Sequence, residues 1–142
     1  MTTGSADTAI PEGFAPLFRT SPFLDLLGPF FYRPAESGFV IGLRVDEKHV
    51  NARSTAHGGF LLTLADMALG YTAEASADPP IRLTTVNISA DFVGEARIGD
   101  WVEAQVDVQR IGRRLVFANA FLVTRGKRIT RASAVFARLT AG

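Results

Sequence analysis

The feature that most constrains the fold is an 18-residue segment, residues 58–75, with the sequence GGFLLTLADMALGYTAEA. Its length and composition predict a helix with apolar side chains on nearly every face, which is typical of a helix buried on most sides. Such a helix requires other elements to surround it. Asp66, in the middle of the segment, is the single carboxylate between Arg53 and Glu74.

Six other segments favour β-structure and can supply these surroundings. Residues 101–109 alternate between apolar and polar side chains, as a strand with one buried face does, whereas residues 115–123 are apolar on both faces. Short loops between the last three segments predict antiparallel neighbours. The six predicted strands are 29–35, 38–45, 82–93, 101–109, 115–123 and 128–139.

A short helix is predicted at 21–28, because Ser21 suits the N-cap, Pro22 the first turn and Gly28 the position after the end. This order of elements predicts the α+β class, with a curved antiparallel sheet of five to six strands wrapped around one long central helix. The apolar helix and the strand that is apolar on both faces need more burial than one copy provides. We therefore expect a homodimer or homotetramer.

Composition places the chain among globular proteins, with 47% hydrophobic and 20% charged residues. We expect a flexible N-terminus over 1–12 and a single domain over 13–142. No signal peptide is predicted in MTTGSADTAI, and charges interrupt every apolar run before it reaches membrane-spanning length, so no membrane partner is expected. The absence of cysteine excludes disulfides and CxxC metal sites and fits a cytoplasmic protein.

The net charge of +1 conceals a segregation of charged residues along the chain. All 14 acidic side chains lie in residues 1–107, whereas 8 of the 15 basic ones lie in residues 108–142. One explanation is neutralisation between strands, with Glu103 and Asp107 facing the arginines. The other is that some of the arginines bind a polyanionic ligand.

Arg113, Arg114 and Arg131 are the best candidates for binding phosphate groups, because a planar guanidinium contacts two phosphate oxygens at once. A solvent-exposed hairpin tip explains Arg113 and Arg114 equally well. Nucleic acid is not an expected partner, because the basic segment lacks the exposed, interleaved aromatic side chains that stack on bases.

The polar positions of the long predicted helix form one stripe. Gly59, Thr63, Asp66 and Gly70 follow each other at spacings of 4, 3 and 4 residues, which places them on the same face. A solvent-exposed face would normally carry Lys, Glu, Gln or Arg, so two glycines, a threonine and one aspartate are unusual there. The stripe either faces solvent with an ordinary aspartate, or lets a ligand approach the helix backbone closely.

The first N–H groups of this helix have no partner within the helix and carry the positive end of its dipole. Gly58 and Gly59 leave these groups uncovered, so a carbonyl oxygen can approach them. Asp66 lies about 12 Å further along the axis, at 1.5 Å per residue. One chain's Asp66 is therefore far from its own Gly58, and two antiparallel copies of the helix would bring the two groups together.

These residues resemble the signature of a known family. Asn51, His57-Gly58-Gly59 and Leu64-Ala65-Asp66 are similar to the N…HGG…L-x-D pattern of hotdog-fold acyl-CoA thioesterases, in the phenylacetate-pathway and 4-hydroxybenzoyl-CoA-like branch. The resemblance covers roughly residues 20–140. It implies an acyl-CoA substrate, a dimer or dimer of dimers, and no metal or other cofactor.

The resemblance also implies a role for each matched residue. The Gly58 N–H would polarise the thioester carbonyl, and Asn51 would hold the carbonyl or the attacking water. His57 would support the loop or the leaving sulfur. Asp66 from the partner subunit would be the general base or the nucleophile, and Thr85 would position the water.

The chain departs from the family pattern at three places near the site. Ser54 stands where the family usually has Gly, Ala56 replaces a bulkier apolar residue, and the strand after the helix ends in Val93-Gly94-Glu95 rather than in a Pro-containing turn. These changes affect the expected loop geometry and leave the reactive groups in place. Phe60 and Met67 are candidates for an apolar acyl pocket, and each is equally consistent with ordinary core.

Other kinds of site are less consistent with the sequence. His49 and His57 are the only histidines, and no further ligand falls at a spacing that would complete a zinc site. A Ser-His-Asp site is rejected because no GxSxG motif is present. Two alternatives to a thioesterase stay open: a non-catalytic hotdog module that binds acyl-CoA as a sensor, and a hotdog hydratase or dehydratase.

Overall fold

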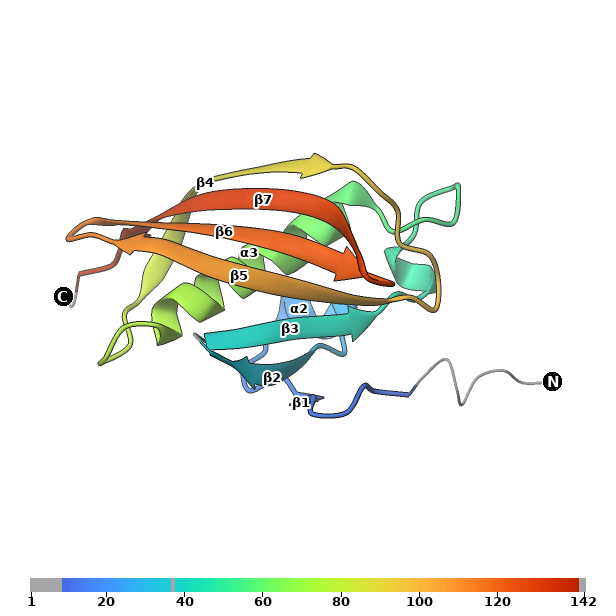
Figure 1. Ribbon diagram of the computed structural model, residues 1–142, viewed down its shortest axis with the longest axis horizontal. Coiled ribbons are helices and arrows are strands. Elements are labelled where there is room, and N and C mark those ends of the chain that lie inside the picture. The colour runs from blue at the N-terminus through green and yellow to red at the C-terminus, as the bar shows by residue number, and fades with distance from the viewer. Residues whose placement is uncertain (1–8, 37, 141–142) are drawn as a thin grey trace.

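The computed structural model describes residues 9–36 and 38–140, and its strands form one antiparallel sheet in the order β1-β2-β3-β5-β6-β7-β4 (Figure 1). The strands are β1 (Ala15–Pro16), β2 (Phe31–Ala35), β3 (Gly38–Arg44), β4 (Leu83–Phe92), β5 (Trp101–Ile111), β6 (Leu115–Thr124) and β7 (Lys127–Arg138). The helices are α2 (Pro22–Leu27), the short 3-10 helix η1 (Glu47–His49) and α3 (Gly58–Ala75).

This architecture confirms the predicted α+β hotdog fold. The six expected strands are present, and β1 is a seventh that pairs with Phe31 and Tyr32 of β2. Two residues are too few to show an alternating pattern, which is why the sequence did not reveal β1. Most of the N-terminal segment that was predicted to be flexible, 1–12, lies outside the described residues.

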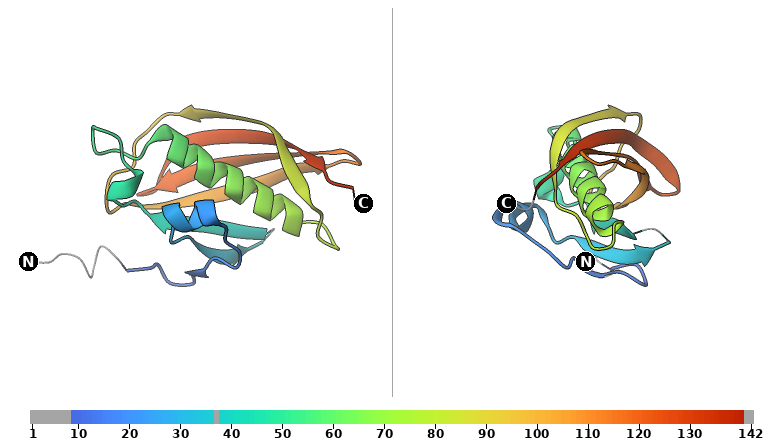
Figure 2. Two further views of the ribbon diagram at one scale, coloured as in Figure 1. Left: turned by 180° about the vertical axis from the view of Figure 1, so that it is seen from behind. Right: turned by 90° about the vertical axis from the view of Figure 1, so that its left-hand side faces the viewer.

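The sheet curves around α3, which contacts β3, β4, β5, β6 and β7 (Figure 2). On β6, Val116, Ala118, Ala120 and Leu122 are buried, while Leu115 and Phe117 stay partly exposed on the outer face. The strand that reads as apolar on both faces thus has one face in the core and one on the surface.

The short helix α2 lies beside α3 on the open side of the curved sheet (Figure 2). Its N-cap is Ser21, whose hydroxyl oxygen accepts a hydrogen bond from the Leu24 N–H at 3.2 Å, as predicted. Leu24 is buried against the core, whereas Phe23 and Leu26 are exposed. The position of α2 matters for the site because it forms one wall of the groove described below.

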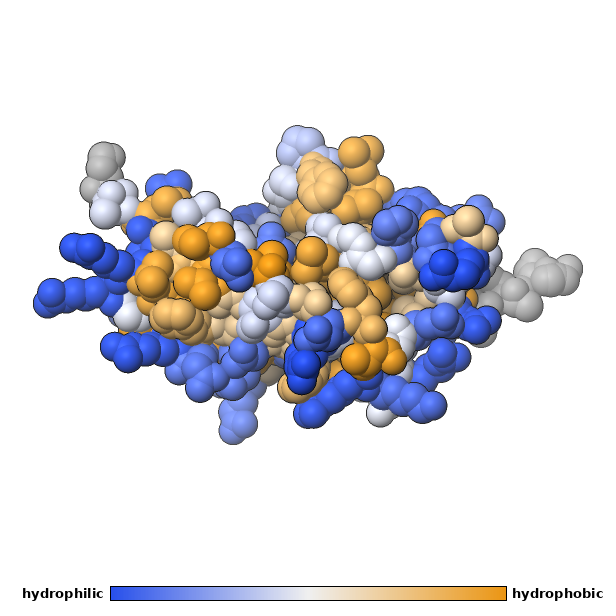
Figure 3. All heavy atoms as spheres, turned by 90° about the horizontal axis from the view of Figure 1, so that it is seen from above, coloured by the Kyte–Doolittle hydropathy of each residue, from blue (hydrophilic) through white to orange (hydrophobic). Residues whose placement is uncertain are grey.

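Strand β4 is one edge of the sheet, and no other strand of the described residues pairs with its outer side. Three large apolar side chains on or just after it are exposed: Val86 (59%), Phe92 (47%) and Val93 (72%). Figure 3 looks down on this side of the molecule, where hydrophobic side chains form several exposed patches. A long unpaired edge with exposed apolar side chains favours pairing with another strand.

Of the basic residues in 108–142, only Arg125 and Arg131 pair with a carboxylate of the described residues. Arg131 binds Asp91 on the neighbouring strand β4, with Nη2 at 2.9 Å from the carboxylate, whereas Glu103 lies 3.8 Å from Arg33 on β2. The explanation in which Glu103 and Asp107 face the C-terminal arginines is therefore not supported: neither forms an ion pair with them among the described residues, and β6 separates β5 from the β7 strand that carries Arg131.

No helix among the described residues is long and apolar enough to cross a membrane.

Candidate active site

The carboxylate of Asp66 is held by a hydroxyl group from the sheet. The Thr85 hydroxyl donates a hydrogen bond to Asp66 Oδ1 at 2.9 Å, which joins the middle of α3 to the start of β4. A β-bulge at Val86 interrupts the pairing of β4 with β7 directly after Thr85. A β-bulge changes the direction of neighbouring side chains, and this bulge directly follows Thr85, the strand residue that contacts Asp66.

Asp66 opens onto a groove of about 260 Å³. The predicted stripe lies along it, since Thr63, Asp66 and Gly70 all line the groove, and Glu74 extends the stripe by one more turn. Apolar side chains form most of the remaining wall: Phe23 and Leu24 from α2, Met67 and Tyr71 from α3, Leu83 from β4 and Phe136 from β7. The small-residue stripe therefore faces a groove whose wall is largely apolar, and Asp66 is half-buried within it.

The start of α3 combines a histidine cap with an uncovered glycine. His57 is the N-cap, and its Nδ1 accepts a hydrogen bond from the Gly59 N–H at 3.3 Å. This contact requires Nδ1 to be unprotonated, so the neutral ring carries its proton on Nε2. The Gly58 N–H has no hydrogen-bond acceptor among the described residues. Of the two glycine N–H groups, Gly58 is thus the one available to a ligand.

The loop before His57 is organised by Asn51. Its side-chain Oδ1 accepts hydrogen bonds from the backbone N–H groups of Arg53 (2.9 Å) and Thr55 (3.3 Å), and also from the Thr55 hydroxyl (3.2 Å). Its Nδ2 donates to no acceptor in the described part of the chain and is therefore available. Ser54 within this loop has φ 63°, the left-handed region that favours glycine. The family's usual Gly at this position would relieve that conformation.

His49 is buried and connects the loop before α3 to α2 through hydrogen bonds. Its Nδ1 accepts from the Asp46 N–H at 2.9 Å, and its Nε2 lies 2.6 Å from the Leu27 carbonyl oxygen, to which it donates. The ring stacks on Phe60, and the His49 carbonyl oxygen accepts from the His57 N–H at 2.8 Å. Burial lowers the pKa of His49 below 6.5, with the Leu27 hydrogen bond opposing this shift.

The structure separates the two candidates for an acyl pocket. Both side chains are 7% exposed, but Met67 lines the groove beside Asp66, whereas Phe60 does not line it and packs against His49. Gly59 is exposed, but its N–H is used by His57. The apolar pattern of α3 could not distinguish groove from core, because both surroundings select the same side chains.

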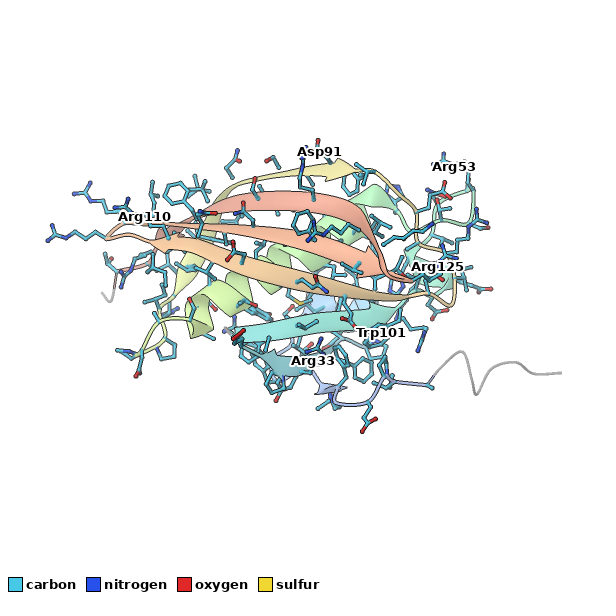
Figure 4. All side chains as sticks on the ribbon, in the orientation of Figure 1. Arg33, Arg53, Asp91, Trp101, Arg110 and Arg125 are labelled. Carbon is cyan, nitrogen blue, oxygen red and sulfur yellow. The ribbon has the colours of Figure 1, made fainter. Side chains whose placement is uncertain are left out.

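The basic candidates lie at different places. Arg113 and Arg114 occupy the β5–β6 hairpin tip, at the end of the molecule opposite the start of α3 (Figure 1), with no carboxylate of the described residues within 4 Å. Figure 4 shows Arg110 at that end and Arg53 at the other. Arg53 lies on the loop held by Asn51 and was missed by the sequence analysis. Arg131 is already paired with Asp91.

Sequence reasoning also missed a cluster at the far end of the groove. Arg19 lies over the Tyr71 ring at 4.0 Å and forms a 2.8 Å salt bridge with Glu74. The hydrogen bond that Arg19 donates to the Glu74 carboxylate raises the pKa of the Arg19 guanidinium above its usual value. The two partners are 55 residues apart, and no local pattern connects them.

Among residues 9–36 and 38–140, no three His, Cys, Asp or Glu side chains gather in a way that could hold a metal ion. His49 in particular uses both ring nitrogens in hydrogen bonds to the backbone.

Comparison with known proteins gives consistent matches. The sequence profile described as Thioesterase superfamily matches residues 54–130. A Pseudomonas aeruginosa protein, provisionally described as an esterase, is 52% identical over 128 residues, covering 89% of this chain and 96% of that protein. Human acyl-coenzyme A thioesterase 13 is 27% identical over 126 residues, covering 85% of this chain and 86% of that protein.

A solved structure agrees with these matches. A mutant of the phenylacetic acid degradation protein PaaI from Thermus thermophilus superimposes with a TM-score of 0.74 at 26% identity, over 84% of this chain and 100% of that one. The matched profile includes the segments that carry Gly58, Asp66 and Thr85.

Proposed function

The chain belongs to the thioesterase superfamily, and on that premise we propose that it hydrolyses acyl-coenzyme A thioesters at a site shared by two copies of the chain. The observation that carries this proposal is the half-buried Asp66 carboxylate, which opens onto a groove and is oriented by the Thr85 hydroxyl. The 27% identity to human acyl-coenzyme A thioesterase 13 supports coenzyme A as the thiol.

The proposed reaction adds water to the thioester carbonyl carbon. With Asp66 as general base, its Oδ2 takes a proton from water, the C–O bond forms, and the C–S bond then breaks. The proton passes to the coenzyme A thiolate, and the products are a carboxylic acid and a thiol. With Asp66 as nucleophile, the carboxylate attacks the carbonyl carbon, the C–S bond breaks and coenzyme A leaves as the thiolate; water then cleaves the mixed anhydride, which releases the acid, restores the Asp66 carboxylate and supplies the proton to the thiolate. In both routes the atoms and electrons balance without a metal, redox group or other cofactor.

The Gly58 N–H is proposed to stabilise the negative charge that develops on the carbonyl oxygen. A backbone donor of this kind contributes about 10²–10³ in rate, because it is already oriented before the reaction. Within one chain, Gly58 and Asp66 are about 12 Å apart along the axis of α3. The Gly58 of one copy is therefore proposed to act with the Asp66 of the other.

Strand β4 supports this arrangement. Two copies that pair antiparallel through their β4 edges would cover Val86, Phe92 and Val93, and would set the two α3 helices side by side in opposite directions. Phe92 already lies next to Gly58, since a Cβ atom on Gly58 would be 3.7 Å from the Phe92 ring. The proposed dimer contact and the proposed oxyanion site therefore adjoin each other.

The remaining site residues are assigned supporting roles. The Asn51 Nδ2 is proposed to donate to the carbonyl or to the water, while its Oδ1 keeps the loop in place. His57 is proposed to support the loop through Gly59. In the proposed antiparallel dimer, the Arg113 and Arg114 hairpin tip is proposed to lie near the start of the other copy's α3 and to bind the phosphates of coenzyme A.

The test is thiol release from acyl-CoAs of short, medium, long and aryl type, measured with a colorimetric thiol reagent. The chain has no cysteine, so the protein gives no signal of its own. We expect Asp66→Asn to fold normally and to lose at least about 100-fold in rate. Equal rates for both proteins would refute the mechanism. If neither protein releases thiol and acyl-CoA stabilises the wild-type protein against unfolding, the binding module is favoured. Addition of water to an enoyl-CoA would favour the hydratase.

A further inference from the structure

The groove beside Asp66 ends at a second groove. The first has a volume of about 260 Å³ and the second about 480 Å³, and Arg19, Tyr71, Glu74 and Leu83 line both. Beyond these shared residues the second groove is lined mainly by apolar side chains, namely Phe18, Phe39, Ala75, Pro80, Ile81 and Leu139, with Arg82. Two largely apolar spaces therefore meet at one boundary, which carries a polar cluster of Arg19, Tyr71 and Glu74.

The polar cluster is fixed on several sides. The Arg19 Nη2 donates to Glu74 Oε1 at 2.8 Å, and the guanidinium lies over the Tyr71 ring at 4.0 Å. The other carboxylate oxygen, Glu74 Oε2, accepts from the Leu83 N–H at 3.0 Å, where β4 begins. Both oxygens of Glu74 are thus engaged within the protein, so the cluster is better suited to block an alkyl chain than to bind a polar group on it.

The length of the first groove follows from α3. Asp66 and Glu74 are eight residues apart on one face, which corresponds to about 12 Å along the axis. With carbon–carbon bonds of about 1.5 Å, an extended alkyl chain advances about 1.3 Å per bond, so about nine bonds fill this distance. Gly70 lies midway, and a Cβ atom there would meet only the Phe136 ring, at 3.7 Å. The absence of a side chain at Gly70 keeps the groove open.

We propose that Arg19, Glu74 and Tyr71 form a gate that limits the acyl group to about eight to ten carbons, and that the second groove is an extension closed by this gate. The proposal rests on the proposed function, because it places the thioester carbonyl beside Asp66. A longer chain must separate the Arg19–Glu74 pair to enter the second groove, whereas a medium-length chain ends against it.

The test compares the kcat/KM values of each variant for hexadecanoyl-CoA and octanoyl-CoA as a ratio, so that a general loss of activity cancels. In Arg19→Ala the ratio should rise at least about tenfold over wild type, because the two grooves become continuous. Arg97→Ala is the matched control, since it breaks another exposed arginine–glutamate pair, with Glu95, that lines neither groove. Its ratio should equal that of wild type.

Gly70→Val provides an independent test because it narrows the first groove before the gate. The ratio of kcat/KM for octanoyl-CoA to that for butanoyl-CoA should fall at least about tenfold. The double variant Gly70→Val/Arg19→Ala should remain restricted to short chains, since the obstruction precedes the opened gate. A double variant that hydrolyses hexadecanoyl-CoA as Arg19→Ala does would overturn the proposed path.

The outcomes separate the two proposals. A wild-type protein that hydrolyses the octanoyl and hexadecanoyl thioesters equally well, or an Arg19→Ala ratio unchanged from wild type, overturns the gate and leaves the thioesterase function standing. A wild-type protein that hydrolyses no acyl-CoA of any length overturns the proposed function, and the gate with it.

Discussion

Removal of the Thr85 hydroxyl tests whether the strand positions the reacting carboxylate. Thr85→Val keeps the branched shape and removes the donor to Asp66 Oδ1, which lies 2.9 Å away. A hydrogen bond to a charged group contributes about 1.5–3 kcal/mol, and the lower end applies here because Thr85 is exposed in the single chain. About 1.5 kcal/mol corresponds to roughly tenfold in rate.

The expected result is a roughly tenfold loss of kcat with little change in KM, because the oriented carboxylate matters most in the transition state. Steady-state thiol release over a range of acyl-CoA concentrations measures both constants. Thr85→Ser retains the hydroxyl and should recover most of the activity. In the Asp66→Asn background, where the carboxylate is absent, Thr85→Val should cost less than about twofold.

Two results would refute this reasoning. Thr85→Val within twofold of wild type would mean that the hydrogen bond has no part in catalysis. An equal loss in the wild-type and Asp66→Asn backgrounds would mean that Thr85 acts independently of Asp66, for example by contacting the substrate directly.

Three further predictions concern pH dependence, strain and assembly. Burial lowers the pKa of His49, so the contribution of the neutral His49 ring to stability is complete above pH 6.5 and is lost as the pH falls through the pKa of His49 in the folded protein. Thermal melts from about pH 7.5 to about 5.5 should therefore show a fall in Tm, and this fall should be smaller in His49→Gln. Ser54→Gly should raise the free energy of unfolding, measured in urea, by up to about 1 kcal/mol. The reason is that relief of about 1–2 kcal/mol of left-handed strain exceeds the entropic cost of glycine, about 0.5–1 kcal/mol. A decrease in the free energy of unfolding would contradict this. Val86→Lys should lower both the oligomeric mass in sedimentation and the hydrolytic rate, whereas a fully active monomer would disprove the shared site.

Local patterns were sufficient to predict most of the fold. The 18 residues of α3, the caps of α2 at Ser21 and Gly28, and the alternation in β5 all depend on near neighbours in the sequence. The stripe that carries Asp66 and Gly70 was visible for the same reason, because helical spacing alone places its members on one face.

Contacts between distant residues could not be predicted in this way. The Arg19–Glu74 pair spans 55 residues, and it exists only because the loop before α2 passes over the end of α3. The sequence left Phe60 equally consistent with a pocket and with core, and only the distant His49 ring that stacks on it places Phe60 in the core. The hairpin at Arg113 and Arg114 is a candidate anion site by composition, and its position at the end of the molecule opposite the start of α3 depends on the sheet order.

Three features near the start of α3 are unfavourable in a single copy of the chain. Ser54 adopts a backbone conformation that favours glycine, Gly58 and Gly59 open a helix with residues of low helix propensity, and β4 ends in exposed apolar side chains. Two of them adjoin each other, since the Phe92 ring lies against Gly58. Folding of one chain explains none of them, because each lowers its stability. A second copy that covers β4, with a substrate carbonyl at the Gly58 N–H, would account for the exposed edge and the glycines together, and we propose that the loop strained at Ser54 presents Asn51 to the same carbonyl.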